Sequence, residues 1–134
     1  MIETAGYRTF FPIKVLLFRF GGVHFGVDAD QVASTSVYRA DDGADEPLWF
    51  HREAGYQTGP ATTAPVVAIL RGGDGSSSRM VIGDIEDIVV AEVEHVRPMP
   101  SLVEPYALRK GMWGVLLREG RVYILVDLNR LAGR

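Results

Sequence analysis

The chain has 134 residues and no Cys, which fits one domain whose core forms without a disulfide or a metal. Without thiols, a thiolate zinc site, an iron–sulfur cluster and a cysteine nucleophile are excluded. Its 14 Lys and Arg against 17 Asp and Glu leave a formal charge of −3, which argues against a nucleic-acid partner. Hydrophobic residues make up 47% of the chain, so we expect a folded globular protein.

Residues 1–8 contain an acid where a secretion signal carries positive charge. The longest uninterrupted apolar runs are Val15–Phe18 and Val122–Val126, whereas a membrane-spanning helix needs about 20 predominantly apolar residues. We therefore expect a soluble, cytoplasmic protein that does not insert into a membrane.

The first predicted elements are strands. Ile13–Phe20 and Val23–Asp28 are apolar stretches separated by Gly21 and Gly22, the pattern of a β-hairpin. A further strand is expected over Val32–Tyr38, where the composition favours extended structure.

Residues 40–64 differ from the rest of the chain. Residues 40–45 form an acidic stretch, and residues 55–64 are polar and contain glycine, so both predict loops. Between them, only Leu48, Trp49 and Phe50 have the side chains to pack into a core.

Three more strands are expected over Pro65–Arg71, Arg79–Ile82 and Ile88–Val96, each bounded by Gly, Pro, Asp or Ser. Residues 72–78, rich in Gly and Ser, connect the first two. This connection lacks the glycine motifs that bind phosphate, so it predicts a hairpin loop.

The C-terminal part begins with a short helical turn over Glu104–Lys110. The strands Met112–Arg118 and Arg121–Val126 then flank a Glu-Gly turn and predict a second hairpin. A last helical turn is expected over Asp127–Leu131, with Asp127 as its N-cap. Short strands with close turns predict a mainly β fold, a sandwich or small barrels with antiparallel pairing.

No residue pattern in the sequence indicates catalysis or metal binding. His24, His51 and His95 are too scattered for a metal motif, and we expect His24 and His95 to point to solvent. Carboxylates in turns usually cap backbone N–H groups, and this interpretation applies to Asp28, Asp30, Asp84, Glu86 and Asp87. We therefore expect no enzyme activity, no metal and no cofactor.

Four aromatic residues have no role in the predicted turns, loops or sites: Trp49, Phe50, Trp113 and Tyr123. In a small β protein such side chains fill the core or cover a recognition surface. The sequence leaves both fates open.

The order of these motifs resembles the CheW-like domain, the adaptor module of bacterial chemotaxis. Residues 17–28 are similar to the family's first hairpin, and residues 114–131 are similar to its last hairpin with the terminal Asp-Leu-x-x-Leu turn. Between them, residues 80–88 are similar to the family's segment that usually ends in an aliphatic residue, an acid, a spacer and an aliphatic residue. Pro98–Leu102 resembles the Pro-rich connector before the last hairpin. The resemblance covers roughly residues 13–39 and 65–131.

The resemblance implies one CheW-like domain over residues 1–134, built from two small SH3-like antiparallel β-barrel subdomains that share one hydrophobic core. The first subdomain would span roughly residues 13–64 and the second roughly residues 65–131, with strand exchange between them. Within the first, residues 40–64 lack the Arg-Gly hairpin that is usual in the family. An incomplete first barrel would leave an open strand edge, which predicts a homodimer.

The resemblance also implies a function without an active site. CheW-like adaptors link the cytoplasmic tip of a chemoreceptor to the regulatory domain of the histidine kinase CheA, part of a two-component system. The expected protein-interaction residues are Val32, Ser34, Val37, Ile85 and Ile88. Ser34 stands where the family commonly has Glu.

Two other functions stay open from the residues themselves. One is a small ligand-binding β-barrel, with Trp49, Tyr56 and the histidines lining a pocket in the diverged segment. The other, ranked third, is an enzyme whose pocket groups the histidines with Asp28 or Asp84.

Overall fold

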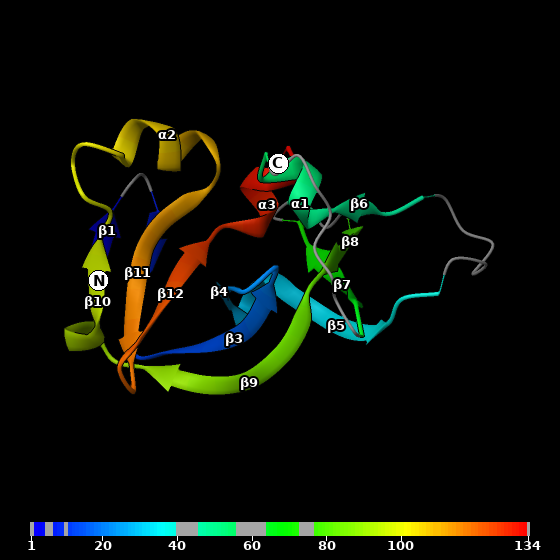
Figure 1. Cartoon of the computed structure of the whole chain (residues 1–134), viewed down its shortest axis with the longest axis horizontal. Helices are drawn as coiled ribbons and strands as arrows, with labels where there is room; N and C mark the ends of the chain where they lie inside the picture. The colour runs from blue at the N-terminus through cyan, green and yellow to red at the C-terminus, as the bar shows by residue number, and fades with distance from the viewer. Residues whose placement is uncertain are drawn as a thin grey trace.

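The computed structural model of this chain describes residues 2–4, 7–9, 11–39, 46–55, 64–72 and 77–133. Its strands form a six-stranded, a four-stranded and a two-stranded sheet, and its helices are short (Figure 1). The predicted mainly β class is therefore confirmed. In the described part of the chain, no helix combines the length and apolar character that crossing a membrane requires.

The six-stranded sheet has the order β10-β11-β12-β4-β3-β9. Its strands are β3 (Ile13–Phe20), β4 (Val23–Asp28), β9 (Asp84–Ala91), β10 (Val96–Pro98), β11 (Met112–Arg118) and β12 (Arg121–Val126). Both predicted hairpins, β3 with β4 and β11 with β12, are confirmed as antiparallel pairs.

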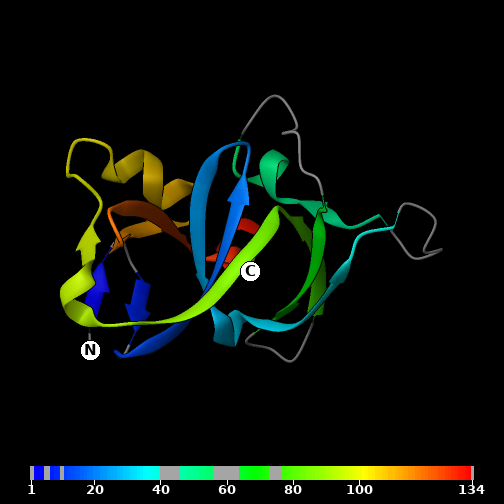
Figure 2. The same cartoon turned by 60° about the horizontal axis from the view of Figure 1, so that its bottom comes forward.

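The four-stranded sheet has the order β5-β7-β8-β6. Its strands are β5 (Val32–Val37), β6 (Leu48–Trp49), β7 (Val66–Arg71) and β8 (Ser77–Ile82). A separate hairpin pairs β1 (Ile2–Thr4) with β2 (Tyr7–Thr9). Figure 2 shows this hairpin at the end of the molecule opposite to β5.

The helical elements are η1 (Ala29–Gln31), α1 (Phe50–Glu53), η2 (Val93–His95), α2 (Glu104–Arg109) and α3 (Leu128–Leu131). The two turns expected near the C-terminus are confirmed as α2 and α3. Asp127 caps α3 as predicted, since its side chain accepts a hydrogen bond from the Arg130 N–H at 3.1 Å.

Two of the strand pairings differ from the antiparallel expectation. β12 runs parallel to β4, and β6 runs parallel to β8. The expectation holds for neighbours that are joined by short turns, because a short turn reverses the chain. The parallel partners are separated by long stretches of sequence, so no short connection dictates their direction.

The single strand predicted over Ile88–Val96 is wrong. β9 begins earlier, at Asp84, and ends at Ala91, and η2 then turns the chain before β10 begins at Val96. The apolar run contains a break because the chain passes there from one edge of the six-stranded sheet to the other.

The passage from β8 to β9 depends on Gly83. An added Cβ at this position would lie 1.8 Å from the backbone oxygen of Arg19, far inside van der Waals contact. Only glycine allows the chain to leave the four-stranded sheet here and join β3 in the six-stranded sheet.

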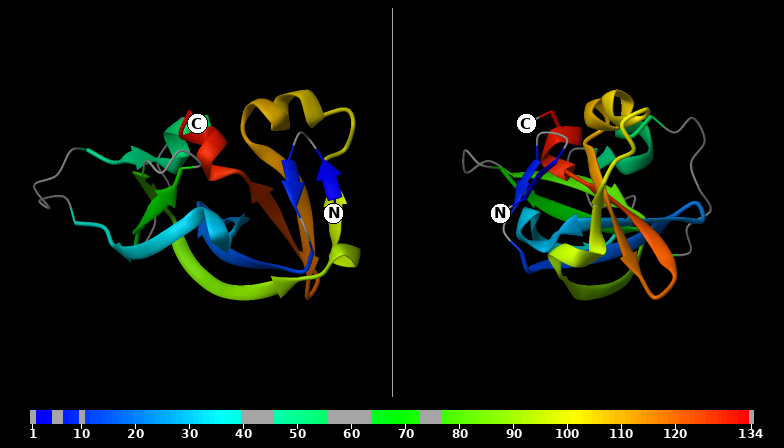
Figure 3. Two further views of the ribbon diagram at one scale, coloured as in Figure 1. Left: turned by 180° about the vertical axis from the view of Figure 1, so that it is seen from behind. Right: turned by 90° about the vertical axis from the view of Figure 1, so that its left-hand side faces the viewer.

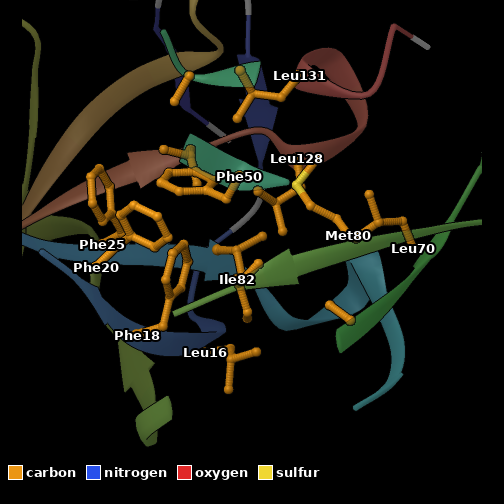
Figure 4. Close-up of a cluster of buried hydrophobic side chains, with 14 residues drawn as sticks. Leu16, Phe18, Phe20, Phe25, Phe50, Leu70, Met80, Ile82, Leu128 and Leu131 are labelled. Carbon is orange, nitrogen blue, oxygen red and sulfur yellow. The ribbon is translucent and has the colours of Figure 1, made fainter. Parts of the chain in front are cut away.

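β3 is buried on both faces. On one face, Leu16, Phe18 and Phe20 belong to the first core cluster, which also contains buried residues of the four-stranded sheet (Figure 4). On the other face, Val15 and Leu17 belong to a second cluster with Trp113, Tyr123 and Leu125 on β11 and β12, among others. β3 is thus the wall between the two clusters, which explains why its central residues do not alternate with polar ones.

The six-stranded and the four-stranded sheet each combine strands from the two halves of the chain. The six-stranded sheet takes β3 and β4 from the N-terminal half and four strands from the C-terminal half, whereas the four-stranded sheet takes β5 and β6 with β7 and β8. The subdomain limits of 13–64 and 65–131 stay a prediction.

Candidate protein-interaction surfaces

The open edge of β9 carries the first apolar surface. Among the described strands β9 pairs only with β3, where Ile88 lies opposite Leu16 and Ile85 lies opposite Phe18. A bulge in this pairing places residues 85 and 88 on the same face although they are three positions apart.

The residues on this face differ in burial. Ile85 is partly buried against the first core cluster, whereas Ile88 and Val90 are each 60% exposed. Branched apolar side chains this exposed at a strand edge bury area only when a partner covers them. We call Ile85, Ile88 and Val90 the β9 surface.

The β9 surface ends at a hollow of about 290 Å³. The hollow lies between the end of β9 and the β11–β12 hairpin, and its walls are formed by Val90, Ala91, His95, Leu116, Leu117, Arg118 and Glu119. Val90 belongs both to the β9 surface and to the wall of the hollow. The β9 surface therefore leads into the hollow, which is flanked by Arg118 and Glu119.

The remaining predicted interaction residues lie on β5. Val32 and Val37 lie opposite Leu70 and Val66 of β7, on the face of the first core cluster. Val32 is partly buried against that cluster, and Val37 is 61% exposed. Ser34 lies opposite Ile69 and therefore on the other face of the sheet. The structure thus places Val32 and Ile85 against one cluster, but it does not place Ser34 with them.

The bulge of β9 is held by polar contacts that the sequence did not reveal. Glu86 accepts a hydrogen bond from Nδ1 of His24 at 2.5 Å and lies 3.5 Å from the Arg121 guanidinium. The His24 ring packs edge-on against Tyr123, with 5.4 Å between ring centroids. His24, expected to point to solvent, is only partly exposed, because Glu86, 62 residues away in sequence, reaches its ring. His95, in contrast, is exposed as expected.

A second apolar surface lies on α2 and the turn before it. Leu102 is 88% exposed and Tyr106 67% exposed, and Val103 is also exposed. Ala107 is buried, so the helix packs by one side and presents Val103 and Tyr106, three residues apart, on another. We call Leu102, Val103 and Tyr106 the α2 surface.

The α2 surface has a cation at its border, since the Arg109 guanidinium lies 5.1 Å from the centroid of the Tyr106 ring. The Pro-rich segment before α2 was recognised in the sequence, but no contact was predicted for it. The available signal was the presence of three large apolar residues, Leu102 and Val103 in a turn and Tyr106 in a short helix, close to prolines.

The two surfaces lie on opposite sides of the molecule. Figure 1 places α2 at the top and β9 at the bottom, and the view from behind in Figure 3 agrees. Two partners could therefore contact the two surfaces at the same time.

Trp49 and His51, candidates for a ligand pocket, take part in ring packing. Trp49 contacts Tyr38 with 5.0 Å between ring centroids, and His51 stacks on Phe20 at 5.6 Å. The Arg52 guanidinium lies 5.8 Å from the Trp49 ring. Burial, and secondarily the charge of Arg52, lowers the pKa of His51.

Two buried polar atoms of this ring cluster, Trp49 Nε1 and His51 Nδ1, have no hydrogen-bond partner among the described residues. Leu48 and Trp49 form a strand that pairs with β8, which is the packed form of this segment. Tyr56, the other aromatic residue of the predicted pocket, lies outside the described residues.

The aromatic residues have mixed fates. Phe50 is fully buried and packs its ring against Phe18, Phe20 and Phe25 in the first cluster (Figure 4). Trp113 and Tyr123 are buried in the second cluster. Of the four residues in question, only Trp49 remains partly exposed, so the exposed apolar surfaces come from aliphatic residues and Tyr106.

Three carboxylates in turns accept hydrogen bonds from backbone N–H groups. Asp28 accepts the Asp30 N–H at 2.9 Å, Asp84 accepts the Ala64 N–H at 3.0 Å, and Asp87 accepts the Ile88 N–H at 2.8 Å. The capping interpretation is confirmed for these three. In the described ranges, no three His, Asp or Glu side chains lie together so as to hold a metal ion.

Comparison with solved structures identifies the fold. No family model matches the sequence, and no curated protein matches it. Among solved structures, the scaffolding protein TtCheW from Thermoanaerobacter tengcongensis is similar, with a TM-score of 0.66 and 11% sequence identity. The match covers 90% of this chain and 92% of that one. The chain therefore has a CheW-like fold.

Proposed function

We propose that this protein is a non-enzymatic adaptor of the chemotaxis type. It would couple a CheA-like histidine kinase, through the kinase regulatory domain, to the cytoplasmic tip of a chemoreceptor or to another CheW-like domain. The observation that carries this proposal is the pair of exposed apolar surfaces on opposite sides of a CheW-like fold. An adaptor needs two such surfaces, whereas a protein with one partner needs one.

The first contact region of the proposal comprises the β9 surface (Ile85, Ile88 and Val90) and, on β5, Val32 and Val37, with Ser34 on the opposite face of that strand. Its exposed aliphatic members, Val37, Ile88 and Val90, lie on edge strands, where a partner gains apolar contact area. The second contact region is the α2 surface. Its Tyr106 has the amphipathic character that is common among residues dominating binding energy.

The partners set the expected location and assembly. A kinase regulatory domain and the tip of a chemoreceptor are both cytoplasmic, so the protein would act in the cytoplasm. A second copy of the chain is a further expected partner, and nucleic acid is not one, given the formal charge of −3.

The alternative function is a small ligand-binding β-barrel. The observation in its favour is the pair of buried, unpartnered atoms Trp49 Nε1 and His51 Nδ1, since such groups usually have a partner. A screen of small polar compounds that follows the fluorescence of a Trp113→Phe variant would detect ligand binding near Trp49. Binding to the kinase domain or receptor tip without any such ligand supports the adaptor instead.

The adaptor proposal is tested by binding titrations with separate variants of the two surfaces. Purified kinase regulatory domain and receptor tip are each titrated, by calorimetry, into the wild type and into Ile88→Glu and Leu102→Glu. A buried charge at a contact centre weakens binding by about tenfold or more, so each variant should lose one partner and keep the other. Val122→Glu, exposed on β12 outside both surfaces, is the matched control and should keep both.

Two results would contradict the adaptor proposal. One is the absence of binding between the wild type and either partner at high micromolar concentration. The other is equal loss of both partners in the two surface variants, which would indicate one contact region only. Circular dichroism of each variant verifies that the fold is kept.

A further inference from the structure

Among the residues that the structure describes, the edge of β5 has none of the features that usually protect an exposed strand. β5 is the terminal strand of the four-stranded sheet and pairs with β7 alone among the described strands. Its residues from Ala33 to Val37 are exposed and include no charged residue and no proline. Natural proteins usually block such an edge with charge, proline or a covering segment, because it otherwise pairs with another strand.

The register of β5 shows which backbone groups face outward. The Tyr38 N–H donates to the Pro65 carbonyl at 3.0 Å, so residues 38 and 65 form a hydrogen-bonded pair. Hydrogen-bonded and non-hydrogen-bonded pairs alternate along an antiparallel ladder. Ser36 therefore bonds toward β7, whereas the N–H and C=O groups of Thr35 and Val37 point away from it.

These four outward groups are self-complementary. When a second β5 approaches antiparallel, about a two-fold axis at Ser36, Thr35 lies opposite Val37 of the partner subunit and Val37 lies opposite Thr35 of the partner subunit. Both pairs then exchange two hydrogen bonds, which makes four and uses every outward group of the two residues. Symmetric pairing of one patch with itself is the usual form of a two-fold dimer.

We infer that β5 is the dimerisation element of this protein and that two copies pair β5 to β5 with the axis at Ser36. The two four-stranded sheets then form one continuous eight-stranded sheet. The pairing also covers Val37, which is 61% exposed in the single chain. This inference rests on the proposed function, whose second-copy partner it specifies. Val37 also belongs to the first contact region, so sedimentation of the protein alone tests the inference separately from kinase and receptor binding.

The inferred register is tested by placing charges on the two facing positions. In T35K/V37K, every Lys lies opposite a Lys of the partner subunit, and like charges directly opposite one another destabilise a strand pair. In T35K/V37E, the same register places each Lys opposite a Glu. Sedimentation equilibrium should show a wild-type dimer, a dissociation constant raised at least about tenfold in T35K/V37K, and a dimer retained in T35K/V37E.

Further controls keep the outcome unambiguous. Val122→Glu, on the other sheet, should leave the dimer unchanged, and circular dichroism should show the same fold in all variants. A wild type that stays monomeric at several hundred micromolar would overturn the inference. The inference would also be overturned if T35K/V37K and T35K/V37E were both folded and dissociated equally. The inferred register places each Lys of T35K/V37E opposite a Glu of the partner subunit, so this variant should keep the dimer. Kinase and receptor titrations of the same wild-type preparation report on the adaptor function separately.

Discussion

His51 is a residue whose protonation the fold opposes. Its ring is stacked on Phe20 and lies beside Trp49, and burial together with Arg52 lowers its pKa. A group with a lowered pKa in the folded state binds fewer protons there than in the unfolded chain. Stability therefore falls as the pH drops below the unfolded value of about 6.5.

We expect the wild type to lose thermal stability between pH 7.5 and pH 5.5, and a His51→Gln variant to lose less over the same interval. Melting temperatures measured by circular dichroism across this range provide the comparison. The other two histidines are present in both proteins, so they contribute equally to both slopes. Identical slopes for wild type and variant would contradict the assignment to His51.

Single residues differ in how well the sequence predicted them. The burial of Phe50 could be predicted because it stands in the one apolar triplet between two polar stretches. The contact of His24 with Glu86 could not, because it depends on strands β4 and β9 lying close to each other on either side of β3. Val32 and Ile85, predicted as protein-interaction residues, are partly buried against the first core cluster, and their role in binding stays a prediction.

At the scale of elements, the side chain of Gln31 in η1 bridges to the start of α3, which lies almost 100 positions later in the sequence. The Gln31 Nε2 donates to Oδ1 of Asp127 at 2.9 Å, and the Leu128 N–H donates to the Gln31 Oε1 at 2.9 Å. Gln31 thus supplies a partner for an N–H of the first turn of α3, which has no partner within the helix. A four-residue helix depends strongly on such contacts, since it is too short to be stable alone.

Gln31→Ala should therefore lower the free energy of unfolding by about 1–2 kcal/mol, because it removes two partly buried hydrogen bonds. Urea denaturation followed by circular dichroism measures the change. Asp30→Ala, one position away and exposed on the same short helix, is the control and should change stability by about 0.5 kcal/mol or less. Equal effects of the two substitutions would argue against the bridge.

Elements with local signals were predictable, and those defined by distant contacts were not. The Asp127 cap and the glycine turns determine α3 and the two hairpins from neighbouring residues alone. The break between β9 and β10 arises because the chain passes there from one edge of the six-stranded sheet to the other. The apolar run from residue 88 to 96 gives no local sign of it. The α2 surface was missed because exposure depends on how the helix packs.

At the scale of the whole molecule, the two core clusters share β3 and should unfold together. Trp49 lies near the first cluster and Trp113 lies in the second, so each reports on one side of β3. In Trp49→Phe and Trp113→Phe variants, the remaining Trp fluorescence should change at the same denaturant concentration as the circular dichroism signal. Separate midpoints for the two probes in either variant would indicate clusters that unfold independently.

The parallel pairs β12–β4 and β6–β8 mark the limit of inference from sequence at this scale. Their partners are brought together only after the hairpins have formed and packed, so no local pattern encodes them. The mainly β class, in contrast, follows from the short apolar segments and their turns.

The position of β3 between two cores also determines which sequence changes the protein can accept. A strand with one solvent-exposed face accepts polar residues at every second position, but residues 15–18 are buried on both faces of the sheet. A polar side chain there would lose its hydration, and a smaller apolar one would open a cavity in one of the two clusters. Polar substitutions should therefore be accepted more readily on the outer strands and loops than at residues 15–18 of β3.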